Sequence, residues 1–227
     1  MLWHRGYYSP SLGKARFNPL PITQIKQNRI ELERKREKEN MDTQKIKIHT
    51  EGTPNPNALK FVIDKTILES GSRDFPDKNN CKDSPLAEKL FKIKSVQEVF
   101  IGKDFITISK SPDSAWDSIY DQVIETINKH FESGEPIVLK TTDSNSKKEN
   151  NFSDIEKRIH EILDSQIRPA VASDGGDVIF DSFEDGVLRL HLQGSCSSCP
   201  SSIMTLKAGI ENMLKRHIPE LKEVISV

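Results

Sequence analysis

The sequence predicts an α+β fold: two small domains that each mix helices and strands, joined by a flexible linker and preceded by a disordered basic N-terminal segment. Both halves of the 227-residue chain contain alternating apolar patterns, typical of strands. Beside them lie patterns with apolar residues every three or four positions, typical of helices. A polar stretch without large apolar residues, 141–151, separates the halves.

The composition is polar for a globular protein. Apolar residues make up 35% of the chain and charged residues 30%, which predicts small cores and some unfolded length. No run approaches the roughly 18 apolar residues of a membrane span, and no short apolar core follows a basic start. We therefore expect a protein that is neither membrane-spanning nor secreted. The net charge is −1, but residues 1–40 carry nine Lys/Arg and four Asp/Glu, a charge of +5. The remaining residues therefore carry −6. A body with this negative charge argues against a nucleic-acid partner.

Residues 1–41 are predicted to precede the folded domains, and their composition allows three interpretations. The first 30 positions hold five basic groups and no acidic one. Such a segment fits an organellar presequence, because these peptides are basic and poor in acidic residues. It also fits a misassigned start upstream of Met41, or a disordered tail. We expect no fold before about residue 42.

Residues 42–138 are predicted to form the first domain. Alternation predicts strands at Lys45–His49 and Ala58–Asp64, interrupted by the TPNPN sequence of 53–57. Residues 69–83 read as a loop that contains Cys81. The later elements of this domain are a helix over 85–93 capped by Ser84, with Pro85 at its first position, a hairpin around Gly102–Asp104, and a helix over 114–133 that ends near Gly134. The last helix carries an apolar stripe of Trp116, Ile119, Tyr120, Val123, Ile127 and Phe131.

Residues 139–152 are the predicted linker, and residues 153–227 the second domain. Ser153 and Glu156 form a capping box for a helix that Pro169 is expected to end. The elements predicted after it are a turn at Asp174–Asp177, a hairpin around Glu184–Gly186, a helix over 200–217 and a final strand over 222–227. The apolar residues expected to face the core are Ile155, Ile159, Ile162, Leu163, Ile167, Leu188, Leu190, Leu192, Ile203, Leu206, Ile210, Met213 and Leu214. A domain of about 75 residues is marginally stable alone, so a ligand or a dimer contact would help it.

The motif that carries chemistry is the pair Cys196 and Cys199, placed between a strand end and a helix start. Only three cysteines occur in the chain, which argues against a disulfide framework and for a reducing compartment. Unpaired N–H groups at a helix start stabilise negative charge and lower the pKa of nearby thiols, which favours the thiolate that binds metal or attacks a disulfide.

Three readings of this pair compete. A thiol-disulfide oxidoreductase would place the pair in a βαβ unit, and the sequence shows none. A zinc site needs four ligands, but His191 is expected on a strand surface, His217 at the far end of the helix, and Cys81 in the other domain with no metal role. An iron–sulfur cluster takes four cysteine ligands. Two copies of the chain would supply them, which predicts a homodimer with an exposed, labile cluster on its two-fold axis.

The sequence resembles NifU-like (Nfu-type) iron–sulfur proteins. The segment Arg168–Lys215, RPAVASDGGDVIFDSFEDGVLRLHLQGSCSSCPSSIMTLKAGIENMLK, is similar to their C-terminal domain in the DGGD turn, the G-x-C-x-x-C-P-S-S core and the following helix. The segment HTEGTPNPNALKFV, with SPLAEKLFKI and GKDFITISK, is similar to their N-terminal domain. The matching regions cover nearly everything after residue 42.

The resemblance implies a carrier rather than an enzyme. It implies that Cys196 and Cys199 of two chains hold one [4Fe–4S] cluster per dimer, with [2Fe–2S] as the second cluster type, and pass it to apo-proteins. Three-domain relatives have a separate scaffold domain with three cysteines, which is absent here, so an upstream assembly scaffold is expected as a partner. Asp174, Gly175, Gly176 and Asp177 are expected to be structural, and the TPNPN loop to serve recognition or structure. Bacterial cytoplasm and mitochondrial matrix both fit as locations.

Overall fold

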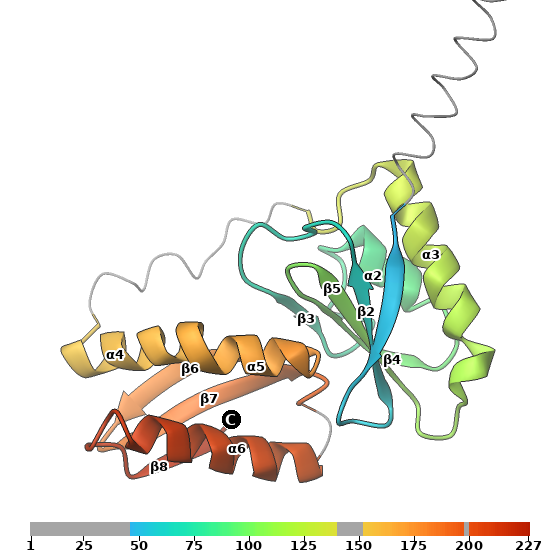
Figure 1. The fold of residues 1–227 in the computed structure, drawn as a ribbon. Helices are drawn as coiled ribbons and strands as arrows, with labels where there is room; N and C mark the ends of the chain where they lie inside the picture. The colour runs from blue at the N-terminus through green and yellow to red at the C-terminus, as the bar shows by residue number, and fades with distance from the viewer. Residues whose placement is uncertain (1–45, 140–151, 198–199) are drawn as a thin grey trace, which may run out of the picture. The chain divides into compact units, whose positions relative to one another are not determined.

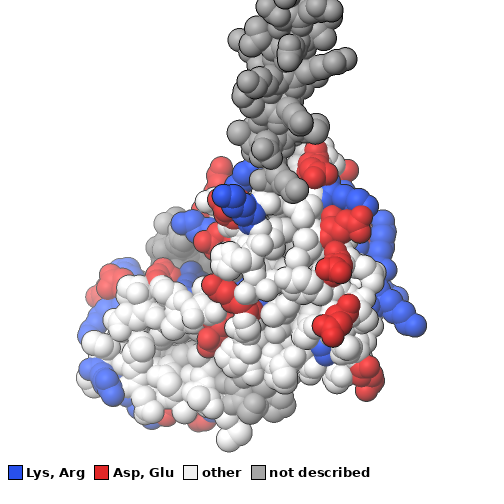
Figure 2. Space-filling view, turned by 45° about the vertical axis from the view of Figure 1, so that its right-hand side comes forward, with Lys and Arg blue, Asp and Glu red and all other residues white. Residues whose placement is uncertain are grey.

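The computed structural model describes residues 46–139, 152–197 and 200–227, within one compact unit, Gln44–Val227. The predictions for residues 1–41 and for nearly all of the linker lie outside the described residues. None of the described helices is long and apolar enough to cross a membrane. On the face shown in Figure 2, acidic and basic side chains are interspersed rather than gathered into one basic patch.

A five-stranded antiparallel sheet forms the first domain (Figure 1). Its order in space is β1-β2-β5-β4-β3. The strands are β1 (Ile48–Gly52), β2 (Ala58–Ile63), β3 (Arg73–Phe75), β4 (Val96–Ile101) and β5 (Phe105–Lys110). The hairpin of β4 and β5 confirms the prediction around Gly102.

Two helices pack on this sheet: α2 (Pro85–Leu90) and α3 (Tyr120–Ser133), which follows a 3-10 turn at Trp116–Ser118. Their apolar sides and the sheet share one core, whose fully buried members include Phe61, Leu86, Leu90, Ile106, Val123 and Ile127. Burying each such side chain contributes about 1.5–3 kcal/mol. The predicted caps are confirmed, because the Ser84 side chain accepts from the Ala87 N–H and Gly134 ends α3 in the left-handed conformation.

The second domain pairs a three-stranded sheet with helices (Figure 1). Its strands are β6 (Gly176–Glu184), β7 (Val187–Gly194) and β8 (Glu223–Ser226). Its helical segments are α4 (Asp154–Ile162), a π-helical turn (Leu163–Ile167), α5 (Arg168–Ser173) and α6 (Pro200–Lys215). A second core joins them, with Ile159, Leu163, Val171, Val178, Leu190 and Leu214 among its buried residues. The capping box of Ser153 and Glu156 is confirmed.

The sequence predicted that Pro169 ends the helix, and this prediction is wrong. The helical path continues from α4 through the π-turn into α5, and Pro169 lies in the first turn of α5. A proline inside a regular α-helix removes one hydrogen bond and clashes with the carbonyl four residues earlier. The wider π-turn just before it and the first-turn position avoid most of that cost.

Other predicted boundaries shift where strand pairing decides them. The first strand covers β1 rather than Lys45–His49, because its pairing with β2 runs from Ile48–Ile63 to Gly52–Leu59. The predicted loop over 69–83 contains the short edge strand β3. The turn predicted at Asp174–Asp177 spans only its first two residues, since β6 begins at Gly176.

The connection from β7 through α6 to β8 corrects a further expectation. The sequence showed no βαβ unit, yet β8 lies next to β7 and parallel to it, with α6 as the crossover. The last strand is only four residues long, so its direction left no signal in the sequence. Cys196 therefore lies between the first strand and the helix of a βαβ unit.

Candidate metal centre

The predicted ligand Cys196 lies in the turn between the end of β7 and the start of α6. Gly194 ends the strand with a φ of +67°, a conformation that favours glycine. The Ser197 N–H then donates to the Gly194 carbonyl at 3.0 Å, which closes the turn. Cys199 lies outside the described residues, so the structure places one of the two predicted ligands.

Two facing glycines let the strands approach closely beside this turn. Gly176 of β6 pairs with Gly194 of β7. A Cβ atom at Gly176 would lie 3.1 Å from the Cys196 Sγ atom and would also clash with the Gln193 carbonyl. A Cβ atom at Gly194 would lie 2.7 Å from the Gly175 carbonyl oxygen. Gly176 of the DGGD sequence thus leaves the space in which the Cys196 sulfur packs.

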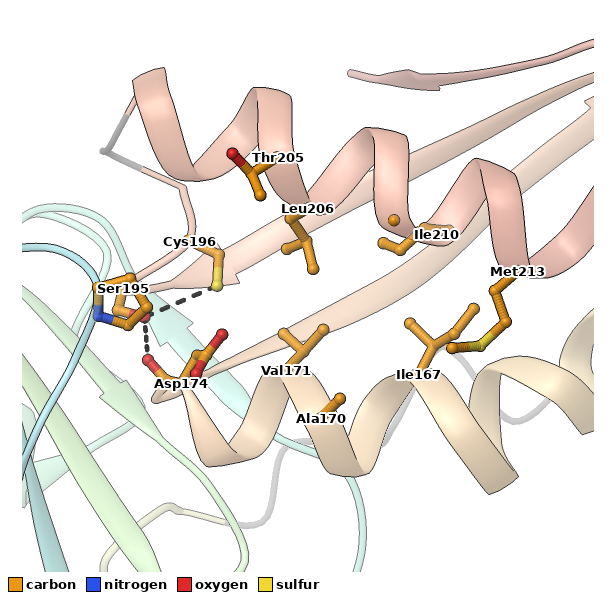
Figure 3. A pocket seen from close by; sticks show the side chains of 12 residues that line it. Ile167, Ala170, Val171, Asp174, Ser195, Cys196, Thr205, Leu206, Ile210 and Met213 are labelled. Carbon is orange, nitrogen blue, oxygen red and sulfur yellow. Dashed lines mark hydrogen bonds between the residues drawn. The ribbon is translucent and has the colours of Figure 1, made fainter.

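Hydrogen bonds tie the turn to the same sequence. The Ser195 hydroxyl donates to the Asp174 carbonyl, and the Ser195 N–H donates to the Gly175 carbonyl at 3.2 Å. The Ser195 Oγ atom also lies 3.7 Å from the Cys196 Sγ atom (Figure 3). Cys196 is only 3% exposed and belongs to the second core, so its backbone and its side chain are both fixed.

Three polar side chains from the first domain also bond to this turn, and the sequence did not reveal them. The Asn55 Nδ2 atom donates to the Ser195 carbonyl at 3.3 Å. The Ser197 hydroxyl donates to the Glu98 carboxylate at 2.7 Å, and the Gly194 N–H donates to the Asp74 carboxylate at 3.4 Å. Asn55 is the middle residue of TPNPN, so this loop has a structural contact with the cysteine turn. The structure buries Asn55. In the sequence, its place between two prolines was the only signal, and nothing there indicated its partner.

Asp74 is electrostatically unusual. The pKa of Asp74 is raised from 3.8 to about 7, chiefly by burial and also by the nearby Glu98 charge, whereas the hydrogen bond from the Gly194 N–H opposes the rise. A carboxyl group with such a pKa is partly protonated near neutral pH. Its charged form therefore costs folding free energy.

An apolar groove opens beside Cys196 (Figure 3). Its volume is about 490 Å³. Side chains from the π-turn and α5 form one wall, and side chains of α6 form the other. Cys196 and Asp174 lie at one end, so the buried thiol borders the groove.

The other candidate ligands lie elsewhere. His191 is on the surface of β7, where its Nδ1 atom lies 2.9 Å from the Val227 carbonyl oxygen and its Nε2 atom 3.5 Å from Asp181. His217 follows the far end of α6. Cys81 is buried in the first core, and its thiol donates to the Lys78 carbonyl. Among the described residues, no group of three or more His, Cys, Asp or Glu side chains could hold a metal ion.

Comparisons with known proteins match both domains. Residues 48–134 match the family model "Scaffold protein Nfu/NifU N terminal", and residues 159–225 match the model "NifU-like domain". The human protein named NFU1 iron-sulfur cluster scaffold homolog, mitochondrial, is 47% identical over 181 residues, which cover 79% of this chain and 71% of the relative. The protein of the same name from Drosophila ananassae is 46% identical over 183 residues, 79% of this chain and 64% of the relative. The chain thus spans about two thirds of the length of these relatives.

A solved structure is also similar to part of the chain. It is the solution structure of a NifU-like protein from Saccharomyces cerevisiae, with 33% identity and a TM-score of 0.40. The match covers 43% of this chain and 88% of the yeast chain.

Asp74→Asn should stabilise the protein in a pH-dependent way. The folded-state pKa lies above the unfolded value of 3.8, so the native carboxyl costs stability progressively as pH rises from about 4 to 7. A rise in pKa from 3.8 to about 7 corresponds by linkage to about 4 kcal/mol at most, so the gain of the variant should be small at pH 4 and reach roughly 2–4 kcal/mol above pH 7. Chemical denaturation across this range measures it. Asp113→Asn, at an exposed position, is the control for simple loss of charge, and an equal gain at pH 4 and pH 8 would contradict the assignment.

Gly194→Ala should destabilise the protein by about 1–3 kcal/mol, because the added Cβ meets backbone atoms at a positive φ. The same change should speed the reaction of Cys196 with a thiol reagent, measured by mass spectrometry of the labelled peptide. Gly52→Ala is the matched control, since a Cβ there meets no atom within 4 Å. Equal stability of the two variants would show that the close approach is not needed.

Proposed function

The chain belongs to the family of Nfu-type, NifU-like scaffold proteins, and we propose that it carries a labile [4Fe–4S] cluster and passes it to apo-proteins. The relatives are named iron–sulfur cluster scaffolds. The observation that carries the proposal to individual residues is the place of Cys196, at the junction of β7 and α6 inside the matched NifU-like domain.

Cys196 and Cys199 of each chain are the proposed ligands. A cluster of this kind takes four cysteine thiolates, and one chain offers two in this motif. A second copy related by a two-fold axis supplies the other two, which gives one cluster per homodimer. The start of the 16-residue helix α6 favours the thiolate form, because unpaired backbone N–H groups stabilise negative charge there.

Transfer follows from ligand exchange. A thiolate of the client replaces a thiolate of this protein on each iron, and the released cysteine takes up the proton that the client thiol loses. No electron is transferred in this step. A client with four cysteines in one cage holds the cluster better than a site split between two chains, so the exchange runs toward the client. The protein acts as a carrier and turns over no substrate of its own.

The expected partners are apo iron–sulfur proteins and an upstream assembly scaffold. The names of the relatives include the word "mitochondrial", which supports the mitochondrial matrix over a bacterial cytoplasm as the location of this protein. A nucleic-acid partner is not proposed, because the described body lacks a basic patch on the face in Figure 2.

A thiol-disulfide oxidoreductase is the second candidate. The βαβ unit of β7, α6 and β8 supports this candidate, because Cys196 lies between its first strand and its helix, and redox C-x-x-C pairs occur near such units. A zinc-bridged dimer would use the same ligands for a structural role. Both alternatives predict that no iron is taken up.

Anaerobic reconstitution with iron and sulfide separates these functions. The wild-type protein should gain visible charge-transfer absorption and about two iron atoms per chain, which equals one four-iron cluster per dimer. Cys196→Ala and Cys199→Ala should each abolish this uptake, whereas Cys81→Ala should leave it unchanged.

Iron binding that survives both motif substitutions would overturn the proposal. Zinc that is retained while iron is excluded would support the bridged structural dimer. Reduction of insulin by cluster-free protein, without iron uptake, would support the oxidoreductase.

A further inference from the structure

We propose that the first domain is part of the cluster site, and that Asn55 and Glu98 are positioning residues for the ligand Cys196. The inference rests on the proposed function and adds to it a role for the first domain. Neither side chain is a ligand, because each acts through a residue next to Cys196. The first domain then sets how firmly the chain holds its cluster.

The first domain bonds to the cysteine turn on both sides of Cys196. The Asn55 Nδ2 atom donates to the carbonyl of Ser195, the residue before it, at 3.3 Å. The hydroxyl of Ser197, the residue after it, donates to the Glu98 carboxylate at 2.7 Å. Two side chains of the first domain therefore hold both neighbours of the proposed ligand.

The bond to the Ser195 carbonyl sets the orientation of the peptide group that leads into Cys196. A trans peptide is planar, and its C=O and N–H point in opposite directions, so a fixed Ser195 carbonyl also fixes the direction of the Cys196 N–H. The second domain holds the other polar groups of Ser195, since its N–H donates to the Gly175 carbonyl and its hydroxyl to the Asp174 carbonyl. The bond from Asn55 completes this set, and the direction of the Cys196 side chain follows from it.

Burial makes these bonds costly to lose. Asn55 is 4% exposed, Glu98 7% and Ser195 1%. A buried polar group that loses its partner is not readily compensated by water. The bond from Ser197 also has an ionised acceptor, which makes it stronger than a bond between neutral groups. Contacts of this kind restrain a backbone far more than bonds at an exposed surface.

The bonds to the turn belong to a broad contact between the two domains. The ring of Phe100 on β4 packs against the end of β7, where a Cβ atom at Gly194 would lie 2.9 Å from it. The Ser72 hydroxyl donates to the carboxylate of Asp177 on β6 at 2.7 Å. Asp74 accepts from the Gly194 N–H. The sheet of the first domain is thus fixed against the strand ends that carry the turn.

Asn55→Asp removes the contact with the turn and keeps the structure of the TPNPN loop. The Asn55 Oδ1 atom accepts from the Asn57 N–H at 3.0 Å, and an aspartate oxygen can accept this bond as well. The second aspartate oxygen replaces the Nδ2 donor and faces the Ser195 carbonyl. Asn57→Asp is the matched control, because it makes the same change in the same loop and can keep the bond from Lys110 to its side-chain oxygen.

The first measurement uses the cluster-free full-length chain and a thiol reagent, with tandem mass spectrometry to follow each cysteine. Cys196 is buried, so its labelling requires the turn to open. Asn55→Asp should raise the labelling rate of Cys196 about tenfold, whereas Asn57→Asp should match the wild type. Cys81, buried in the first core, is the internal standard, and its rate should not change.

The second measurement follows the visible absorption of the reconstituted cluster in the presence of an iron chelator. Asn55→Asp should shorten the lifetime of the cluster about tenfold relative to Asn57→Asp. Glu98→Ala should shorten it as well, whereas Glu98→Gln should restore most of it, because glutamine keeps an oxygen that accepts from the Ser197 hydroxyl. Equal loss in the two Glu98 variants would assign the effect to charge and overturn the role of Glu98.

Each failure has a distinct meaning. If the wild-type chain takes up no cluster, the proposed function fails, and the labelling rates alone decide whether Asn55 holds the turn. If Asn55→Asp and Asn57→Asp agree in labelling and in cluster lifetime, the inference is overturned while the proposed function stands. Faster labelling of Cys81 together with Cys196 would overturn it by revealing a general loosening of the fold. A longer cluster lifetime in Asn55→Asp would overturn it too, by showing that the first domain hinders the site.

Discussion

The close approach of β6 and β7 at Gly176 and Gly194 fixes where the cysteine turn stands. Because neither residue has a side chain, the Cys196 sulfur packs directly against the strand end and the Ser195 hydroxyl reaches the Asp174 carbonyl. Asn55, Asp74 and Glu98 then bond to the turn. The turn that contains Cys196 is thus held by both domains, and the raised pKa of the buried Asp74 is one energetic cost of building it.

In the proposed function, each chain supplies only half of the cluster ligands, so the site would need a partner. The second core lies behind the thiol, and the apolar groove extends from it between α5 and α6. The proposed split site would also favour transfer, because a client that encloses all four thiolates competes against two separate chains. On this proposal, weak retention of the cluster is part of the function of a carrier.

The sequence predicted the fold class, the caps at Ser84 and Ser153 and the hairpins, because these depend on neighbouring residues. It failed where distant contacts decide. The parallel pairing of β8, the edge strand β3 and the passage of the helix through Pro169 all depend on packing that no local pattern records. For the candidate site, the cysteine motif was visible in the sequence. The contacts of Asn55, Asp74 and Glu98 were not, since they join residues about 100 or more positions apart.

Native mass spectrometry of the anaerobically reconstituted full-length chain tests the central claim most directly, because it counts chains and clusters in one particle. Sharing of one cluster between two half-sites predicts a species of two chains with a single four-iron, four-sulfide cluster, and no single chain that carries a cluster. A single chain that carries a complete cluster would contradict the claim.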